Sequence, residues 1–219
     1  MLTILLFSLF LATASYMIGS VNGAIIISRL VYKDDVRLHG SKNAGLTNFL
    51  RTYGKKSAFF VLAIDILKTA VPVLLSGFFF AQFLDFASVE DRLLIGRALG
   101  GLFAMLGHCY PLFSSFKGGK AVLSGGTAVF CISLPIFAIL LVVFLVAVIL
   151  TRYISLGSVL AAFSFPISAF SFQMPLVVSI FALLYASLLI GKHHGNIGRL
   201  VKGTERKLSF KGSREEGSK

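Results

Sequence analysis

The chain reads SAFFVLAIDILKTAVPVLLSGFFFAQF from residue 57 to residue 83. Only two of these 27 residues, Asp65 and Lys68, carry a charge. A helix of this length extends about 40 Å, which exceeds the roughly 30 Å hydrocarbon core of a bilayer. The stretch therefore predicts a membrane-spanning helix. Asp65 and Lys68 are three residues apart, so they share one helix face and we expect them to pair.

The composition of the whole chain extends this prediction beyond one helix. Its 219 residues are 56% apolar and 14% charged, with a mean hydropathy of +0.87. Further long apolar blocks occupy residues 2–30 and 93–113 and most of 121–192. This pattern indicates a membrane protein and excludes an ordinary soluble domain. The net charge of +12 lies mainly between the blocks, where it sets topology, so we expect no nucleic acid partner.

Charge placement predicts how the chain crosses the membrane. The basic stretch 32–56 belongs on the cytoplasmic side, which puts the N-terminus outside and the acidic connection 85–91 outside as well. Pro135 and residues 172–175 are the predicted outer turns of the second half. The fold class is therefore all-α, a polytopic bundle of seven transmembrane helices with a cytoplasmic C-terminus.

Two of these seven helices are short, and an alternative remains. In a five-helix version, residues 121–151 form one long segment. The first block is interrupted near Gly19 and Gly23, which predicts a kink or close packing there. We expect residues 1–207 to form a single domain and 208–219 a polar cytoplasmic tail, disordered over 212–219.

Three polar segments fall on the cytoplasmic side in this topology: residues 39–51, 107–120 and 192–207. Each combines glycines with basic and amide side chains, the ingredients of a phosphate site. The segment Gly118-Gly119-Lys120 opens a predicted helix, whose N-terminus favours a phosphate. Each segment alone could be a capped loop with topology-setting lysines, but three on one side favour a site. With Glu205 as their one carboxylate, we expect no metal and no cofactor.

Together the segments resemble the PlsY family, the acyl-phosphate-dependent glycerol-3-phosphate acyltransferases of bacterial inner membranes. Asp65 and Lys68 resemble a further pair of that family. Ala121 departs from the family, because a glycine usually stands there, and a positive φ at that position would strain an alanine. Leu46, Thr69 and Asn22 are further departures. The matching motif residues are Gly40, Ser41, Asn43, Gly45, Thr47, Asn48 and Arg51; Gly107, His108, Pro111, Phe113, Phe116, Gly118, Gly119 and Lys120; and His193, Asn196, Ile197, Arg199, Leu200, Gly203, Glu205 and Lys207.

The resemblance implies a reaction, the first step of phospholipid synthesis. Acyl phosphate and sn-glycerol 3-phosphate give 1-acyl-glycerol 3-phosphate (lysophosphatidic acid) and phosphate. The expected protein is a monomer of the inner (plasma) membrane, in contact with membrane lipids, with its site facing the cytoplasm. The implied substrate-binding residues are Ser41, Asn43, Asn48, Arg51, His108, Gly118, Gly119, Lys120, His193 and Asn196.

The implied chemistry is direct attack of the glycerol hydroxyl on the acyl carbon. A substrate phosphate takes the proton while Lys120 and loop amides stabilise the developing charge. His193 as general base is the rival hypothesis, and Ser41 as an acyl-enzyme nucleophile is a third. We interpret Asp65 and Lys68 as a structural ion pair ahead of a catalytic one.

A different class of protein is the alternative. The same basic, glycine-rich loops could line the entry of a transporter or channel for phosphorylated anions. The sequence contains no internal repeat, and its polar motifs lie on one side only, both of which disfavour that alternative.

Overall fold

The computed structural model describes residues 1–208, so most of the predicted tail, with the disorder expected over 212–219, lies outside the described residues. Apart from its loops, the described part is helical, and it contains no strand. Its elements are α1 (Leu2–Gly19), α2 (Gly23–Val31), η1 (Val36–Leu38), α3 (Leu46–Tyr53), α4 (Lys55–Phe83), α5 (Val89–Cys109), η2 (Leu112–Ser114), α6 (Val122–Ile132), α7 (Leu134–Thr151), α8 (Ile154–Ser171), α9 (Leu176–Lys192) and α10 (His194–Val201).

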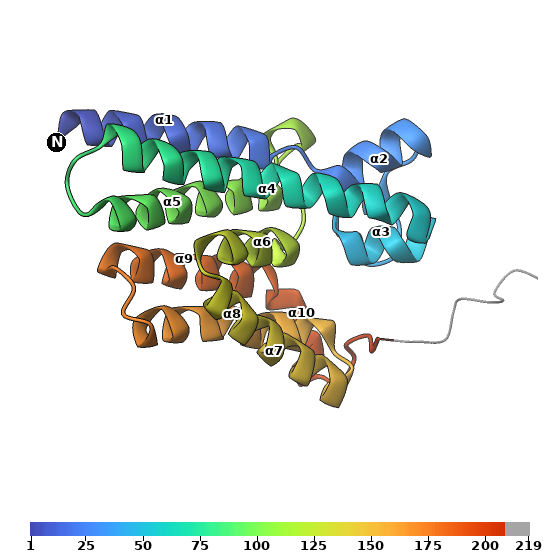
Figure 1. The fold of residues 1–219 in the computed structure, drawn as a ribbon. Coiled ribbons are helices and arrows are strands. Elements are labelled where there is room, and N and C mark those ends of the chain that lie inside the picture. The colour runs from blue at the N-terminus through green and yellow to red at the C-terminus, as the bar shows by residue number, and fades with distance from the viewer. Residues whose placement is uncertain (209–219) are drawn as a thin grey trace, which may run out of the picture.

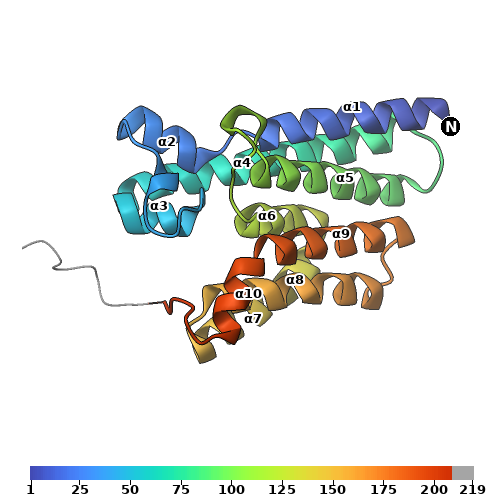
Figure 2. The same ribbon diagram turned by 180° about the vertical axis from the view of Figure 1, so that it is seen from behind.

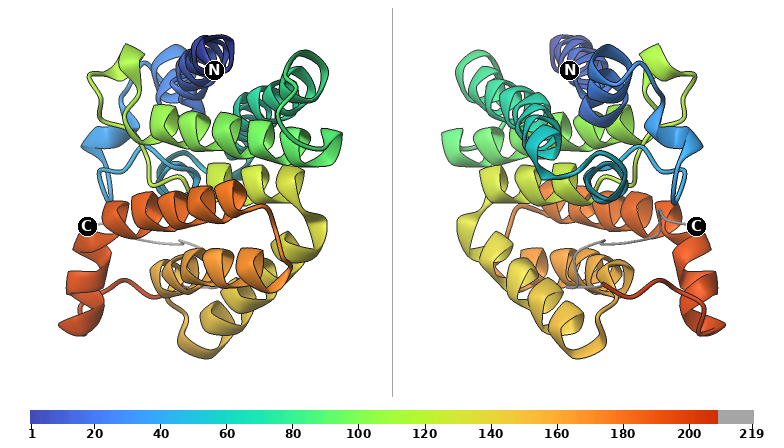
Figure 3. Two further views of the ribbon diagram at one scale, coloured as in Figure 1. Left: turned by 90° about the vertical axis from the view of Figure 1, so that its left-hand side faces the viewer. Right: turned by 90° about the vertical axis from the view of Figure 1, so that its right-hand side faces the viewer.

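The long helices form a bundle with α5 near its middle. Helices α1 and α4 pack on one side of α5, and α6 and α9 pack on the other, with α8 and α7 beyond them (Figures 1 and 3). Glycines allow the closest of these approaches. A Cβ on Gly96 or Gly100 of α5 would overlap α4, at the backbone of Ser76 or Pro72. Such contacts between small residues are typical of helices packed in a membrane.

Five helical segments of the described residues are long and apolar enough to cross a membrane. The pair α9 and α10 makes a sixth if it counts as one span, bent by 60° at His193 (Figure 2). Helix α6 is apolar but has only 11 residues. An all-helical bundle of apolar helices is thus confirmed, while the number seven and the positions of the termini stay predictions.

The predicted helix breaks appear where the sequence placed them. Residues 20–22 separate α1 from α2, and the side chain of Asn22 caps α2 by accepting from the N–H of Ile25 at 3.1 Å. Residues 172–175 join α8 to α9, as expected. Ser133 ends α6 and caps α7, with Pro135 in the first turn of α7. The alternative prediction of one long segment over 121–151 is therefore wrong, because the cap residue Ser133 and Pro135 start a new helix there.

Three loop segments, residues 32–45, 110–121 and 193–207, overlap the predicted polar segments and meet at one end of the bundle, which we call the loop end (Figure 1). The opposite end carries the N-terminus, the α4–α5 connection and the α8–α9 turn (Figure 1). Arg37 ties two of the polar segments together, because its guanidinium donates to the carbonyls of Ser114 at 2.9 Å and Lys117 at 3.3 Å. The same guanidinium holds the pKa of Asp35 well below its usual range.

Candidate active site

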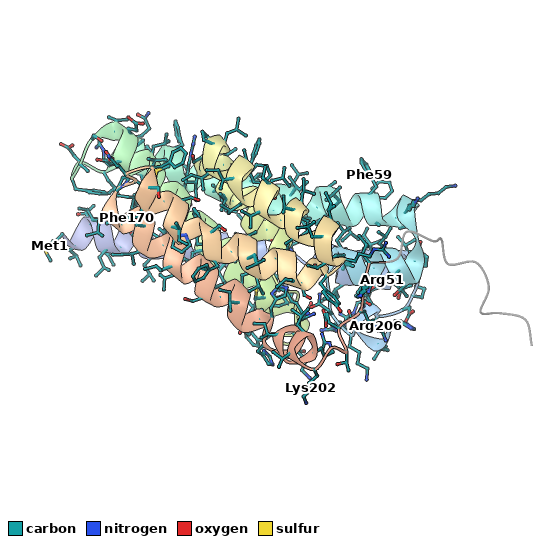
Figure 4. The ribbon with its side chains drawn as sticks, turned by 90° about the horizontal axis from the view of Figure 1, so that it is seen from below. Met1, Arg51, Phe59, Phe170, Lys202 and Arg206 are labelled. Carbon is teal, nitrogen blue, oxygen red and sulfur yellow. The ribbon has the colours of Figure 1, made fainter. Side chains whose placement is uncertain are left out.

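A cavity of about 1000 Å³ opens at the loop end and continues between the helices. Its loop-end part is lined by polar and basic side chains, among them Arg51 and Arg206, which lie far from Met1 and Phe170 at the opposite end (Figure 4). Its deeper part is lined by apolar residues of α6, α7, α8 and α9. Eight of the ten predicted substrate-binding residues line this cavity: Ser41, Asn43, Asn48, Arg51, His108, Lys120, His193 and Asn196.

The first polar loop is wrapped around the buried side-chain amide of Asn48, in the first turn of α3. Its Oδ1 accepts from the N–H of Ser41 at 3.0 Å, and its Nδ2 donates to the carbonyls of Val36 and His39. Gly40 has a φ of +55°, and a Cβ on it would overlap the Asn48 Oδ1. Asn48 thus shapes the loop and leaves Ser41 exposed at the cavity, with Arg51 one turn further along α3.

Gly118 and Gly119 do not join the other predicted residues on the cavity wall. Their N–H groups donate to the carbonyls of Cys109 and His108, at 3.3 and 3.1 Å. A Cβ on Gly118 would overlap the carbonyl oxygen of His108, and one on Gly119 would overlap its Nε2. The predicted role of these two amides in holding a phosphate does not suit this geometry, because a satisfied N–H has no bond left to donate. The glycines instead let the loop lie on the last turn of α5.

The residue that precedes α6 is strained, because it has the positive φ that the departure from glycine made a concern. Ala121 is buried and has a φ of +57° and a ψ of +25°, the left-handed conformation that glycine adopts freely. An alanine there costs about 1–2 kcal/mol. The conformation turns the chain so that Lys120 and the N-terminus of α6 both line the cavity.

A chain of polar contacts joins the second and third segments. The Lys120 ammonium donates to Oδ1 of Asn196, whose Nδ2 donates to Glu205 at 2.6 Å. Glu205 also pairs with Arg199 at 2.7 Å and accepts from the hydroxyl of Ser155 at 2.7 Å. Lys120 and Asn196 are 76 residues apart in the sequence, so this chain of contacts exists only in the folded protein.

The residues in this series of contacts shift the pKa values of Lys120 and Glu205. Burial lowers the pKa of Lys120, and the positive charge of Arg199 lowers it further. Burial alone would raise the pKa of Glu205, but hydrogen bonds from Asn196, Ser155 and Arg199 lower it below its ordinary value. Glu205 is therefore an anion at neutral pH and holds Asn196 and Arg199 in place.

The ring of His193 is fixed by the end of its own helix. Its Nδ1 lies 2.8 Å from the carbonyl oxygen of Leu189, which can only accept, so Nδ1 carries the hydrogen. In the neutral ring, Nε2 is then left with a lone pair. His193 is buried and lines the cavity, so this nitrogen is available to accept a hydrogen bond or a proton.

His108 belongs to a different polar cluster, inside the bundle. Lys68 lies 2.7 Å from Asp65 and 2.9 Å from Nδ1 of His108, and all three residues are buried. Asp65 also accepts from the N–H of Gly23, at the start of α2. The predicted pairing of Asp65 with Lys68 is thus confirmed. The cluster joins α2, α4 and α5, which supports a structural role.

Several lining residues were not assigned to the site by the sequence. Arg199 and Glu205 belong to the third motif, which by itself predicts no role for them. Ser155, on α8, lies outside all three motifs and no local signal marks it. The polar lining residues outside the ten predicted substrate-binding residues are Lys42, Thr47, Asp65, Thr127, Ser155, Ser158, Tyr185, Arg199, Thr204, Glu205 and Arg206.

Known proteins resemble this chain over nearly its whole length. The family described as glycerol-3-phosphate acyltransferase matches residues 9–203. A glycerol-3-phosphate acyltransferase of Thermoanaerobacter pseudethanolicus is 34% identical over 206 residues, covering 94% of this chain and 98% of that protein. The one from Shouchella clausii is 38% identical over 200 residues, covering 90% of this chain and 93% of that protein.

Two solved structures have a similar fold. One is a crystal structure of PlsY (YgiH), an integral membrane glycerol 3-phosphate acyltransferase, in its glycerol 3-phosphate form. It is 33% identical, has a TM-score of 0.81, and the match covers 92% of this chain and 96% of that one. The other is the lysophosphatidic acid form, 32% identical with a TM-score of 0.79, covering 92% and 95%.

Proposed function

The chain belongs to the glycerol-3-phosphate acyltransferase family, and on that premise we propose that it transfers an acyl group from acyl phosphate to sn-glycerol 3-phosphate. The products are 1-acyl-glycerol 3-phosphate and phosphate. The chain is an acyltransferase, and membership of this family removes the case for a transporter of phosphorylated anions.

The observation that carries the proposal is the two-part character of the cavity. Its loop-end part gathers basic side chains from three distant segments, including Arg51, Lys120 and Arg199. Its deeper part is apolar and lies between helices. Two phosphate-bearing substrates suit the first part and an acyl chain suits the second, because each meets groups of matching polarity.

We assign glycerol 3-phosphate to the polar part of the cavity. The residues in contact with it are Ser41, Arg51, Lys120, His193 and Asn196, all of which line that part. Asn43 and Asn48 shape the first loop. The donor phosphate lies at the N-terminus of α6, where Val122 and Leu123 line the cavity and a helix start favours an anion.

The proposed chemistry is a direct displacement at the acyl carbon. The glycerol hydroxyl oxygen forms the new ester bond, the bond from the acyl carbon to the phosphate oxygen breaks, and phosphate leaves with the proton. Lys120 neutralises the charge that develops. His193 as general base remains the rival, because its Nε2 has a lone pair. Ser41 as a covalent nucleophile would require an acylated Ser41, which mass spectrometry can detect.

We also propose the setting of this reaction. The protein is a monomer in the inner (plasma) membrane, with seven membrane helices of which α6 is the shortest. The N-terminus lies outside, and the loop end and C-terminus face the cytoplasm. The basic residues of segment 32–56 support this orientation, because cytoplasmic loops retain positive charge.

Donor dependence tests the proposal. Purified protein in detergent receives labelled glycerol 3-phosphate with palmitoyl phosphate, with palmitoyl-CoA, or with neither. We expect labelled lipid with palmitoyl phosphate only. Product with palmitoyl-CoA alone would replace the proposed donor, and no product with either, from protein that unfolds cooperatively, would overturn the proposed reaction.

A further inference from the structure

Two aromatic rings close the deep apolar part of the cavity on the side of α8 and α9. Phe165 and Tyr185 both line the cavity, and both are almost fully buried. Their ring centroids are 5.5 Å apart at an interplanar angle of 69°, an edge-to-face contact. Such a pair is stabilised beyond the burial of its rings alone, so it resists separation.

Tyr185 is also held from behind, by α5. Its hydroxyl donates to the carbonyl oxygen of Ala98 at 3.0 Å, within the bundle. Gly101, one turn along α5, provides the space for this hydroxyl, because a Cβ there would overlap it. A buried phenol that gives up this bond leaves its O–H unsatisfied, which is costly. The ring is therefore a fixed wall of the cavity.

The cavity ends at these rings on α8 and α9. Ala161 and Ala162, on the loop-end side of Phe165, line it, as does Leu189 on the loop-end side of Tyr185. Ala169 and Ala182, about one turn beyond the two rings, are fully buried and do not line it. Phe165 lies ten residues beyond Ser155, so the wall stands about 15 Å from the polar part of the cavity.

A second aromatic pair marks the other possible course for a bound chain. Phe130 and Phe137 also line the cavity, with ring centroids 5.3 Å apart. Phe130 is half exposed, so this side of the cavity is not sealed by packed protein. A chain that ran past Phe130 would have no fixed end, whereas a chain directed at Tyr185 would.

We propose that Tyr185, backed by Phe165 and anchored to Ala98, limits the length of the acyl chain that the enzyme accepts. This inference rests on the proposed function, because it takes the apolar part of the cavity as the acyl site. For donors whose chain ends before Tyr185, each added methylene raises kcat/KM. Longer donors must displace the ring and break its hydrogen bond, so their kcat/KM is lower.

The test is a chain-length profile of kcat/KM, measured with acyl phosphates of increasing length. Tyr185→Ala removes the wall and should move the optimum to longer chains, with about a fourfold gain for each methylene newly buried. Tyr185→Phe keeps the ring but loses the hydrogen bond to Ala98, so the optimum should stay near the wild-type length while donors longer than the optimum lose less kcat/KM than they do with the wild-type enzyme. Leu184→Ala is the matched control, because Leu184 is the neighbouring residue, is exposed and lies outside the cavity lining.

A second variant and a second measurement protect the test. If Tyr185→Ala does not fold, Phe165→Leu opens the same wall with a smaller loss of volume. Thermal stabilisation by 1-acyl-glycerol 3-phosphates of increasing length needs no turnover. It reports chain binding even if acyl phosphate is not the donor, so failure of the proposed reaction and failure of the length limit are distinguishable.

A shifted optimum in both wall variants, with both kcat/KM and stabilisation following it, would support the inference. If both variants keep the wild-type profile, or if the Leu184→Ala control shifts it equally, Tyr185 does not limit chain length. The course past Phe130 would then be the path of the chain.

Discussion

The ends of α5 and α9 each bring a histidine to the cavity, but they hold the two rings in opposite ways. At the end of α5, the Lys68 ammonium donates to Nδ1 of His108, so the hydrogen of the neutral ring lies on Nε2. At the end of α9, Nδ1 of His193 donates to a backbone carbonyl, so Nε2 is the acceptor. Nε2 of His108 is a donor and lies against Gly119, whereas Nε2 of His193 is an acceptor and lies at the cavity.

The partner of Nδ1 thus determines the chemistry that each histidine can perform. The buried Lys68 ammonium occupies Nδ1 of His108, so this nitrogen cannot accept a proton. The ring belongs to a polar cluster that joins helices. A carbonyl leaves His193 free to bind a hydroxyl or take a proton, close to Lys120 and Asn196. Four variants test this contrast, in decreasing order of expected free-energy change.

Lys68→Met tests the polar cluster that orients His108 at the end of α5. It leaves Asp65 as a buried, unpaired charge and removes the group that orients His108, which should destabilise the protein by about 3–5 kcal/mol. In detergent this corresponds to a decrease in Tm of about 10 °C. The double variant Asp65→Asn/Lys68→Met removes both charges and should recover part of the loss. A Tm equal to the wild-type value in Lys68→Met would contradict the structural role of the pair.

Lys120→Ala tests whether the positive charge near His193 and Asn196 stabilises the charge that develops in the reaction. Loss of one preorganised charge at the reacting centre should lower kcat/KM by about 10²–10³-fold, with little change in Tm. Lys117→Ala is the matched control, since Lys117 is exposed in the same loop and does not line the cavity. Equal activities of the two variants would remove Lys120 from the mechanism.

His193→Gln tests whether Nε2 of His193 binds the substrate or takes the proton. If a substrate phosphate takes the proton, the loss of the Nε2 acceptor should raise KM for glycerol 3-phosphate about tenfold and lower kcat less than that. A general base would cost about 10²–10⁴-fold in kcat instead. His194→Gln, at the exposed neighbouring position, serves as the control. A kcat loss in that larger range would favour the rival hypothesis.

Glu205→Gln should have the smallest effect. The folded-state pKa of Glu205 lies below its ordinary value of 4.5, so its stabilising contribution is complete above that value and is lost as pH falls through the folded-state pKa. The variant should be less stable by about 1 kcal/mol at pH 7, because Arg199 is partly exposed and solvent screens the pair.

The two stability curves should therefore converge below pH 4.5 and run parallel between pH 6 and 7. Glu90→Gln, exposed at the opposite end of the bundle, is the control. A difference that grows as the pH falls would contradict the depressed pKa of Glu205.

Much of the architecture was predictable because membrane helices carry strong local signals. The break near Gly19, the turn next to Pro135 and the pairing of Asp65 with Lys68 follow from composition and helical spacing. The departure from glycine at Ala121 marked a position where a positive φ would strain the chain, and the structure gives it a φ of +57°. Hydrogen-bond partners carry no such signal, so the prediction for the amides of Gly118 and Gly119 did not anticipate that α5 already satisfies them.

Local sequence features predict which residues enter a membrane, where the helices break, and that three basic, glycine-rich segments gather at one end. These features depend on hydrophobicity, helix period and turn chemistry, which act over a few residues. Only the tertiary structure decided that Lys120 meets Asn196, that Ser155 meets Glu205, and that Tyr185 closes the apolar part of the cavity. Those contacts join residues far apart in the chain, and they are set by the packing of α5 against α6 and α9 and of α10 against α8.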